Sequence, residues 1–500
     1  MKGARKIPAV MFSQHPDNAG RPYWHDHPCI KTHHELKECH LMFKDMGADE
    51  VMWDWEGKLV DEAVIEKLWS EYPKFFKNNP LGKKIFLTFR IPNPSVESGY
   101  RLGRAFMVIL SARDLVDNTT LATPLFEIIL PMTESAHDLI RIHEIFKGFS
   151  AIAHSDLGAN KLNGKPLEII PLFEKVHTIL NSKSILLEYI NLYKKEFKTN
   201  PLYLRPFCAR SDPALNSGIV PTTLAIKWAL SEYANLAKEC GVDIHPIIGP
   251  GPSPFRGGFT PDTTDAFLKE FSGIKTFLVQ SSFRYDYPLH SVNKAIKKIS
   301  KNNQNKKALA KNLSKNILQE IEQIIPWFEK PYQKTVEKIA PLINLIAPYI
   351  PKRRERVQHI GLFGYSRKVG KTKLPRAIGF TASCYSLGLP PELFGLGTGL
   401  AKAKKENKIK LIQNLYQSLD STIITAGKYL RKESLVELGL TEMAKDIKLI
   451  EEYIGKKFGP TSAKEKKHVA LSGEIIKKIL KKKNPTQEIE QAALLRQWLG

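Results

Sequence analysis

The chain has 500 residues, of which 42% are hydrophobic and 25% charged, a balance typical of globular proteins rather than disordered ones. Its net charge of +24 suggests nucleic acid binding, but much of the excess is lysine after residue 290, in runs without the interleaved aromatic residues of single-strand binders. No apolar run approaches the ~20 residues of a membrane span, and the N-terminus lacks a signal peptide's apolar core. The five cysteines form no C-x-x-C pair, which favours reduced thiols in a cytoplasmic protein.

Short apolar runs rich in β-branched residues alternate with amphipathic stretches as far as about residue 290. The predicted strands are 5–13, 49–55, 84–90, 125–131, 167–173, 202–209, 242–248 and 275–280. The predicted helices between them are 33–46, 61–76, 97–114, 136–147, 175–196, 221–240 and 263–271. This alternation indicates parallel strands with right-handed crossovers. Eight such units predict an α/β fold, a TIM-type (β/α)8 barrel over residues 1–290.

After residue 290 the strand signals stop, and helical apolar spacing continues to the end of the chain. The predicted helices are 308–325, 335–348, 408–431, 434–453 and 463–482. We therefore expect a large C-terminal all-helical extension over residues 291–500. Within it, residues 361–399 are rich in glycine and proline, and we expect this segment to return to the mouth of the barrel.

Polar residues follow the predicted strands, where a (β/α)8 barrel places its chemistry. Glu174 and Asp212 end the fifth and sixth strands, so they are close enough to share a hard cation such as Mg²⁺, unless each pairs with a neighbouring arginine. His15 follows the first strand and is either an acid–base group or a structural histidine.

Seven arginines lie near strand ends or in the segment 361–399. They are Arg90, Arg205, Arg210, Arg256, Arg284, Arg367 and Arg376. The guanidinium fork fits phosphate and carboxylate groups. Each arginine alone can form a structural ion pair, but the whole set indicates an anionic substrate. Arg256 lies in a loop rich in glycine and proline, residues 249–258, which can close over a site.

Seven motifs together resemble the archaeal-type phosphoenolpyruvate carboxylases, the short form of that enzyme. They are residues 13–17 (SQHPD), 53–57 (WDWEG), 170–174 (IPLFE), 205–218 (RPFCARSDPALNSG), 254–258 (PFRGG), 280–288 (QSSFRYDYP) and 374–378 (LPRAI). The resemblance extends from about residue 5 to residue 500. It implies that phosphoenolpyruvate and bicarbonate give oxaloacetate and phosphate, through carboxyphosphate and the enolate of pyruvate, with Mg²⁺ or Mn²⁺. It also suggests a homotetramer.

The resemblance implies roles for individual residues. His15 matches the histidine that takes the proton from carboxyphosphate, and Glu174 and Asp212 match the metal ligands. Arg256 matches a loop arginine near bicarbonate, and Arg376 matches an arginine at the barrel mouth. Four further arginines are candidates for substrate binding. They are Arg90, for the phosphate, Arg367, similar to the arginine of a Ser-Arg-Pro motif in the long form, and Arg210 or Arg284, for the charge that the long form carries where this chain has Pro250.

Two other functions remain as alternatives. A metal-dependent aldolase or lyase acting on pyruvate or phosphoenolpyruvate would need no bicarbonate, so bicarbonate dependence distinguishes it. A nucleic-acid-binding protein using the lysine-rich half would show affinity that falls steeply with salt, but it leaves the strand-end arginines without a purpose.

Overall fold

The structure is a computed structural model, and it describes residues 6–57, 59–97, 99–117, 123–155, 166–304, 312–355, 367–369 and 372–500. Within these residues, eight parallel strands close into a barrel in the order β1-β10-β9-β7-β5-β4-β3-β2. The strands are β1 (Val10–Phe12), β2 (Glu50–Asp54), β3 (Phe86–Arg90), β4 (Glu127–Leu130), β5 (Glu168–Phe173), β7 (Phe207–Ala209), β9 (Ile247–Gly249) and β10 (Thr276–Val279). The predicted TIM-type barrel with a helical extension is confirmed.

The strands form because their side chains are buried on both sides, which suits β-branched and large apolar residues. The barrel interior holds a compact apolar cluster: Met11, Met52, Ile129, Ile170, Leu172, Phe207, Ala209, Ile247 and Leu278. The outward side chains pack against the surrounding helices in the larger core. The interior is therefore a packed core, so chemistry is confined to the ends of the barrel.

The helices around the barrel follow the predicted alternation, with breaks at particular residues. They are α1 (Glu35–Lys44), α2 (Val64–Glu71), α3 (Pro73–Asn78), α4 (Arg101–Asp117), α5 (Ala136–Ser155), α6 (Val176–Leu180), α7 (Ser182–Phe197), α8 (Ser211–Ser217), α9 (Ile219–Cys240), α10 (Thr264–Glu270), α11 (Ser281–Tyr285) and α12 (Leu289–Gln304). The predicted helix 61–76 is divided at Pro73, which begins α3, because proline fits a first helical turn but not a helix interior.

Two predicted strands are also divided at a proline. The run 202–209 contains Pro206, and the run 242–248 contains Pro246. Before these prolines, β6 (Tyr203–Leu204) and β8 (Asp243–Ile244) pair in a separate two-stranded parallel sheet. After them, β7 and β9 join the barrel. Proline lacks the backbone N–H that would continue the hydrogen-bond ladder, which explains both interruptions.

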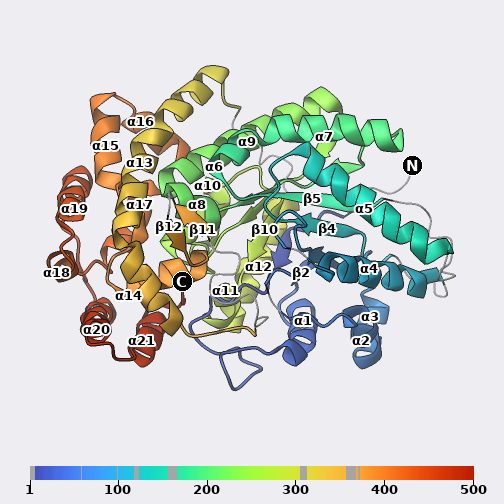
Figure 1. The fold of residues 1–500 in the computed structure, drawn as a ribbon, viewed down its shortest axis with the longest axis horizontal. Coiled ribbons are helices and arrows are strands. Elements are labelled where there is room, and N and C mark those ends of the chain that lie inside the picture. The colour runs from blue at the N-terminus through green and yellow to red at the C-terminus, as the bar shows by residue number, and fades with distance from the viewer. Residues whose placement is uncertain are drawn as a thin grey trace.

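The rest of the described chain is mainly helical and lies beside the barrel, coloured yellow to red in Figure 1. Its helices are α13 (Lys315–Ile346), α14 (Ala377–Ser386), α15 (Leu396–Lys405), α16 (Ile409–Leu415), α17 (Leu419–Gly427), α18 (Lys432–Glu437), α19 (Thr441–Ile454), α20 (Ala463–Leu480) and α21 (Thr486–Arg496). The predicted helices 308–325 and 335–348 overlap α13, which continues through three prolines. Residues 308–311 lie outside the described part of the chain, and residues 347 and 348 belong to a 3-10 turn. The predicted boundary at residue 290 lies in α12, which packs against α10 and β1 of the barrel.

The segment 361–399 contains the elements nearest to the barrel mouth. Residues 361–366, 370 and 371 lie outside the described part of the chain. The remainder forms a hairpin of β11 (Arg367–Val369) and β12 (Thr372–Leu374), then α14 and a 3-10 turn, η5 (Pro391–Leu393). The hairpin and α14 pack against α8, and η5 packs against η2 (Pro254–Arg256), the turn after β9. Figure 1 shows the hairpin between the barrel and the outer helices.

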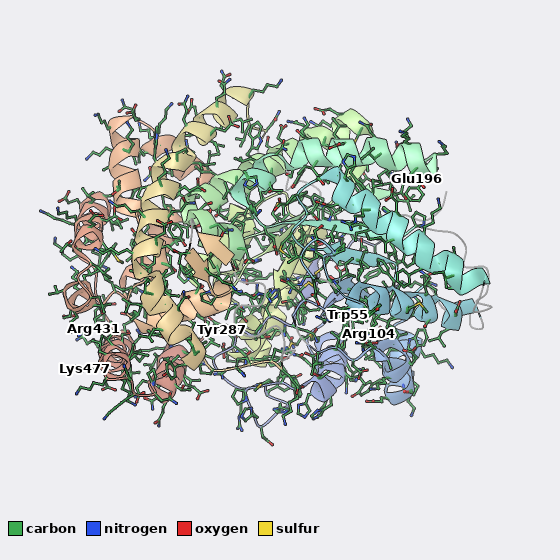
Figure 2. All side chains as sticks on the ribbon, viewed as in Figure 1. Trp55, Arg104, Glu196, Tyr287, Arg431 and Lys477 are labelled. Atoms are coloured by element: carbon green, nitrogen blue, oxygen red, sulfur yellow. The ribbon has the colours of Figure 1, made fainter. Side chains whose placement is uncertain are left out.

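None of the helices in the described ranges combines the length and the apolar character that a membrane span requires. Figure 2 shows Trp55 in the barrel half and Lys477 of α20 at the outer edge of the helical region. The lysine runs of the sequence therefore include exposed helix positions such as Lys467 and Lys477.

Candidate active site

His15 lies in the loop after β1, at the carboxyl end of the barrel. Its Nδ1 is 2.8 Å from the hydroxyl oxygen of Ser13. Burial, followed by the positive charge of Arg90, holds the pKa of the imidazole well below its usual value, and Arg256 and Arg376 act in the same direction. The ring is therefore neutral near pH 7 and lies among three of the arginines that the sequence singled out.

Arg90 is the last residue of β3 and lies opposite Asp54 in the register of β2 and β3. Its Nε and Nη2 donate to the two carboxylate oxygens of Asp54 at 2.8 Å and 2.6 Å, and its Nη1 is 2.7 Å from Glu56. Burial lowers the pKa of Arg90, but Asp54 and Glu56 outweigh burial and leave it raised. This arginine is held rigidly in its charged form.

Arg376 comes from the helical region, as the residue that precedes α14. Its Nη2 is 3.2 Å from the carboxylate of Glu56, and its side chain keeps 19% of its surface exposed. Glu56 itself is fully buried. One carboxylate therefore connects an arginine of the barrel with an arginine of the helical region, so the two regions complete the site together.

Arg256 ends the η2 turn and is 1% exposed. Its Nε donates to Ser211 at 3.0 Å and its Nη1 to Asp17 at 3.1 Å. The remaining donors reach the side-chain oxygen of Gln280 and the carbonyl oxygen of Gly500. Burial outweighs the attraction of Asp17 and lowers the pKa of this guanidinium.

The loop before Arg256 requires glycine at one close approach. A Cβ atom on Gly251 would lie 2.6 Å from the guanidinium carbon of Arg256. The loop closes on itself, because the N–H of Gly251 donates to the carbonyl oxygen of Arg256 at 2.7 Å. Glycine at this position therefore lets the backbone pack against the arginine side chain.

Glu174 and Asp212 follow β5 and β7, which pair directly through Phe173 and Cys208. Glu174 is 6% exposed and raises the pKa of Arg90, whereas Asp212 acts on Arg256. A cavity of about 530 Å³ borders Glu174 and is also lined by Thr133, Asn216, Ser217 and Glu329. In the described residues, no three His, Cys, Asp or Glu side chains form a metal-binding group by themselves. Glu174 beside the cavity and Asp212 after the neighbouring strand are the kind of oxygen ligands that suit Mg²⁺, which usually completes its shell with water and substrate oxygens.

The other candidate arginines lie in different surroundings. Arg284 donates to the carbonyl oxygens of Ser13 and Val279 at 2.8 Å and 3.1 Å and forms an ion pair with Glu38 at 3.3 Å. Arg210 donates to the carbonyl oxygen of Phe255 at 3.2 Å. Both side chains are buried and bonded to neighbouring protein groups. Arg367 begins β11, but its side chain lies outside the described part of the structure.

Several residues of this site were not singled out from the sequence, namely Asp17, Asp54, Glu56, Ser211 and Gln280. All of them lie within motifs at strand ends. The signal that could have found them is charge balance, because a buried arginine needs acceptors and the nearest strand-end carboxylates are the obvious ones. Asp17 is fully buried, and burial raises its pKa.

Comparison with known proteins gives one consistent family. Residues 7–500 match the family model described as phosphoenolpyruvate carboxylase. A phosphoenolpyruvate carboxylase of Oenococcus oeni is 37% identical over 99% of each chain. One of Metallosphaera sedula is 36% identical over 99% of this chain and all of its own, and one of Pyrococcus horikoshii is 39% identical over 88% of this chain and 92% of its own.

The similarity to solved structures is too low to indicate a function for this chain. RipC from Yersinia pestis covers 57% of this chain and 94% of its own, with 14% identity and a TM-score of 0.29. The match to the family model and to relatives of the same length agrees with the resemblance of the strand-end motifs. The chain therefore belongs to the archaeal-type phosphoenolpyruvate carboxylase family.

Proposed function

We propose that this protein catalyses the reaction of phosphoenolpyruvate with bicarbonate to give oxaloacetate and phosphate. The observation that carries the proposal is the convergence of His15, Arg256 and Arg376 at one end of the barrel. Glu174 and Asp212 act electrostatically on two arginines of the same site. A neutral base, buried cations and two carboxylates match a reaction in which negative charge moves between substrate groups.

The reaction proceeds in two stages. A bicarbonate oxygen attacks the phosphorus of phosphoenolpyruvate, and the bond between phosphorus and the enol oxygen breaks, which gives carboxyphosphate and the enolate of pyruvate. Carboxyphosphate loses its proton to His15 and separates into CO2 and phosphate. The enolate carbon then forms a bond with CO2, and the proton passes from His15 to phosphate.

The surroundings of His15 suit this proton transfer. Its lowered pKa, caused first by burial and next by Arg90, keeps a lone pair on the imidazole at neutral pH. In the tautomer whose Nδ1–H donates to the Ser13 hydroxyl, Nε2 carries the lone pair that accepts the proton of carboxyphosphate. General bases of this kind typically contribute about 10²–10⁴-fold to the rate.

The arginines have separate roles in the proposal. Arg90 and Arg376 share Glu56, which orients both guanidinium groups toward the phosphate and carboxylate of the substrate. Arg256 has one side-chain carboxylate partner, Asp17, and binds bicarbonate and then carboxyphosphate. We assign only secondary contributions in substrate binding to Arg210, Arg284 and Arg367, because the arginines that act on His15 are Arg90, Arg256 and Arg376.

Mg²⁺ or Mn²⁺, held by Glu174 and Asp212, is part of the proposal. When bound, the cation would supply positive charge that stabilises the negative charge developing on the substrate. A homotetramer in the cytoplasm also belongs to it, in keeping with the resemblance to the family and with the five free cysteines.

The direct test measures oxaloacetate with malate dehydrogenase and NADH, with and without bicarbonate, for the wild type, His15→Asn and His290→Asn. His290 is an exposed histidine of α12 and serves as the matched control. We expect bicarbonate-dependent NADH oxidation by the wild type and the control. The His15 variant should lose at least about 100-fold in oxaloacetate formation and release pyruvate from phosphoenolpyruvate. No bicarbonate-dependent oxaloacetate from the wild type would contradict the proposal.

The metal assignment is tested by calorimetric titration with Mn²⁺, without any turnover. Glu174→Gln and Asp212→Asn should each weaken Mn²⁺ binding by at least about tenfold, because each removes one of two anionic ligands. Glu134→Gln is the control, since Glu134 lines the same cavity but pairs with Lys175. Equal affinity in all four proteins would exclude these two ligands.

A further inference from the structure

The turn that carries Arg256 is covered by the helical region. The ring of Phe255 lies 5.6 Å from that of Phe380 on α14 and 6.4 Å from that of Tyr332 on α13, stacked at 19°. The η5 turn packs against the same residues of η2. Arg256 therefore owes its position in part to residues that lie far from it in the sequence.

One acidic residue occupies this contact. Glu392 of η5 is 2% exposed, and the hydroxyl of Tyr385 donates to its Oε1 at 2.7 Å. The backbone N–H of Phe255 also interacts with this carboxyl and lowers its pKa. Oε2 has no well-aligned hydrogen-bond donor in the described ranges. The carboxyl thus faces the peptide unit next to Arg256.

Arg210 binds the other polar group of the Phe255 backbone, its carbonyl oxygen. Its Nη1 donates to the carbonyl oxygen of Phe255 at 3.2 Å, and its Nη2 lies 3.4 Å from the hydroxyl of Tyr416. Arg210 is also close enough to Glu392 to lower the pKa of that carboxyl. The backbone of Phe255 therefore lies between an acidic group that faces its N–H and a basic group that binds its C=O.

We propose that Glu392 is a positioning residue, which holds the turn of Arg256 from the helical region so that its protonation state changes the placement of the Arg256 guanidinium. The inference rests on the proposed function, because it assigns a role in that reaction. Glu392 does not lie among the groups that surround His15, so it acts through Phe255 and Arg210.

The protonation of Glu392 changes in a useful pH range. Burial raises its pKa to about 7, against the opposing effects of Tyr385, Phe255 and Arg210. The ionised form attracts Arg210 and accepts more strongly from the Phe255 amide. The ionised form should therefore hold the turn more firmly, and the protonated form less firmly.

The phenol and thiol groups of α13 and α14 near Glu392 stay uncharged in this range, and the charged groups of α15, α17 and α19 have partners of their own. Tyr385 and Cys384 on α14 and Tyr332 on α13 have pKa values raised well above the usual ones, in each case first by burial. Asp420 of α17 accepts from Tyr453, and Lys402 of α15 pairs with Glu406. Asp446 of α19 accepts from the backbone of Gly397 and Thr398.

The test compares Glu392→Gln with the wild type from pH 6 to pH 8.5 in the coupled assay. Glutamine keeps the shape and the acceptor but stays neutral at every pH. We expect the ratio of wild-type to variant kcat to be close to one at pH 6 and to rise at least fivefold by pH 8. The KM for phosphoenolpyruvate should change less than twofold. Asp446→Asn is the matched control, a second buried carboxyl of the helical region, and its ratio should stay constant.

Glu392→Leu removes the acceptor as well and should be impaired at all pH values, whereas Glu392→Asp should recover part of the pH-dependent ratio. Thermal unfolding shows whether each variant is folded. In a folded Glu392→Gln protein, a pH-dependent ratio of kcat values then reports the placement of Arg256 rather than misfolding. A constant ratio for Glu392→Gln in an active wild-type background would overturn the inference and leave the proposed function intact. An inactive wild type would overturn the proposed function itself.

Discussion

Two buried arginines at opposite ends of the barrel show how differently one residue type can be used. Arg205 and Arg256 are each 1% exposed. Arg205 lies at the amino end of the barrel, where it pairs with Glu50 at 2.7 Å and Glu127 at 2.6 Å and donates to Thr276 at 3.1 Å. Arg256 lies at the carboxyl end, where it pairs with the carboxylate of Asp17 and also binds Ser211, Gln280 and the main-chain oxygen of Gly500.

The two pKa values shift in opposite directions for this reason. Burial lowers the pKa of Arg205, but Glu127 and Glu50 outweigh burial and leave it raised. Burial lowers the pKa of Arg256. The attraction of Asp17 is too small to offset burial, and repulsion between Arg376 and Arg256 lowers this pKa further. Arg205 is thus neutralised within the protein, whereas Arg256 gains from an additional anion. A cation held ready for an anion is a common source of transition-state stabilisation.

Removing Arg205 should have the largest effect, which we expect to be a decrease in the free energy of unfolding. Arg205→Met leaves Glu50 and Glu127 buried without their cation, and breaking a buried pair in this way costs about 3–5 kcal/mol. Urea unfolding measures the loss. The control is the triple variant Arg205→Met, Glu50→Gln, Glu127→Gln, which carries no unpaired charge and should regain more than half of the loss. Equal losses for the single and triple variants would mean that charge pairing is not the cause.

Removing Arg256 should mainly lower the catalytic rate. Arg256→Gln should lower kcat by about 10²–10³-fold, the usual cost of losing a donor to developing charge. Its loss of unfolding free energy should be smaller than that of Arg205→Met, because burial of Arg256 is poorly compensated in the folded protein. Activity of the folded variant and its urea midpoint are both measured. The comparison between the two arginines fails if Arg256→Gln destabilises as much as Arg205→Met.

The sequence was sufficient for the barrel and for most strand-end residues, but not for the difference between these arginines. Runs of β-branched residues located all eight strands, since burial on both faces leaves a local pattern. Arg205 was grouped with Arg256 because both lie in motifs with proline and a strand end nearby. Arg205 lies at the amino end of the barrel because Pro206 divides the predicted strand 202–209 and leaves Arg205 before β7. The contact of Glu392 with Phe255 joins residues of two regions, and no local pattern encodes it.

Stability should also respond to pH at the carboxyl end. Asp286 accepts from the backbone N–H groups of Ala19 and Gly20 at 2.8 Å and 2.6 Å, and burial raises its pKa to about 7. The folded protein therefore holds this proton more tightly than the unfolded chain does, so stability falls as pH rises from about 4 to 7. Asp286→Asn stays neutral and should remove a loss of about 3 kcal/mol over that range.

The measurement for Asp286 is urea unfolding at several pH values between about 4.5 and 7.5. Asp262→Asn, at an exposed position, is the control and should follow the wild type. Parallel pH curves for the wild type and Asp286→Asn would show that this carboxyl ionises equally in the folded and unfolded chains.

The smallest expected effect concerns Glu56. It lies at the same end of the barrel as Arg256, but it is as deeply buried as Glu50 and Glu127, the acidic partners of Arg205. It lies 2.7 Å from Arg90 and 3.2 Å from Arg376. Glu56→Gln leaves Arg90 bound to Asp54 but removes the ion pair between Glu56 and Arg376, so the KM for phosphoenolpyruvate should rise about tenfold, or about 1.4 kcal/mol. Glu62→Gln is the control, since it removes a partly exposed pair with Arg104, worth about 0–1 kcal/mol. An unchanged KM in Glu56→Gln would mean that Arg376 is placed by α14 alone, and that the two regions are joined at the mouth by packing rather than by this shared carboxylate.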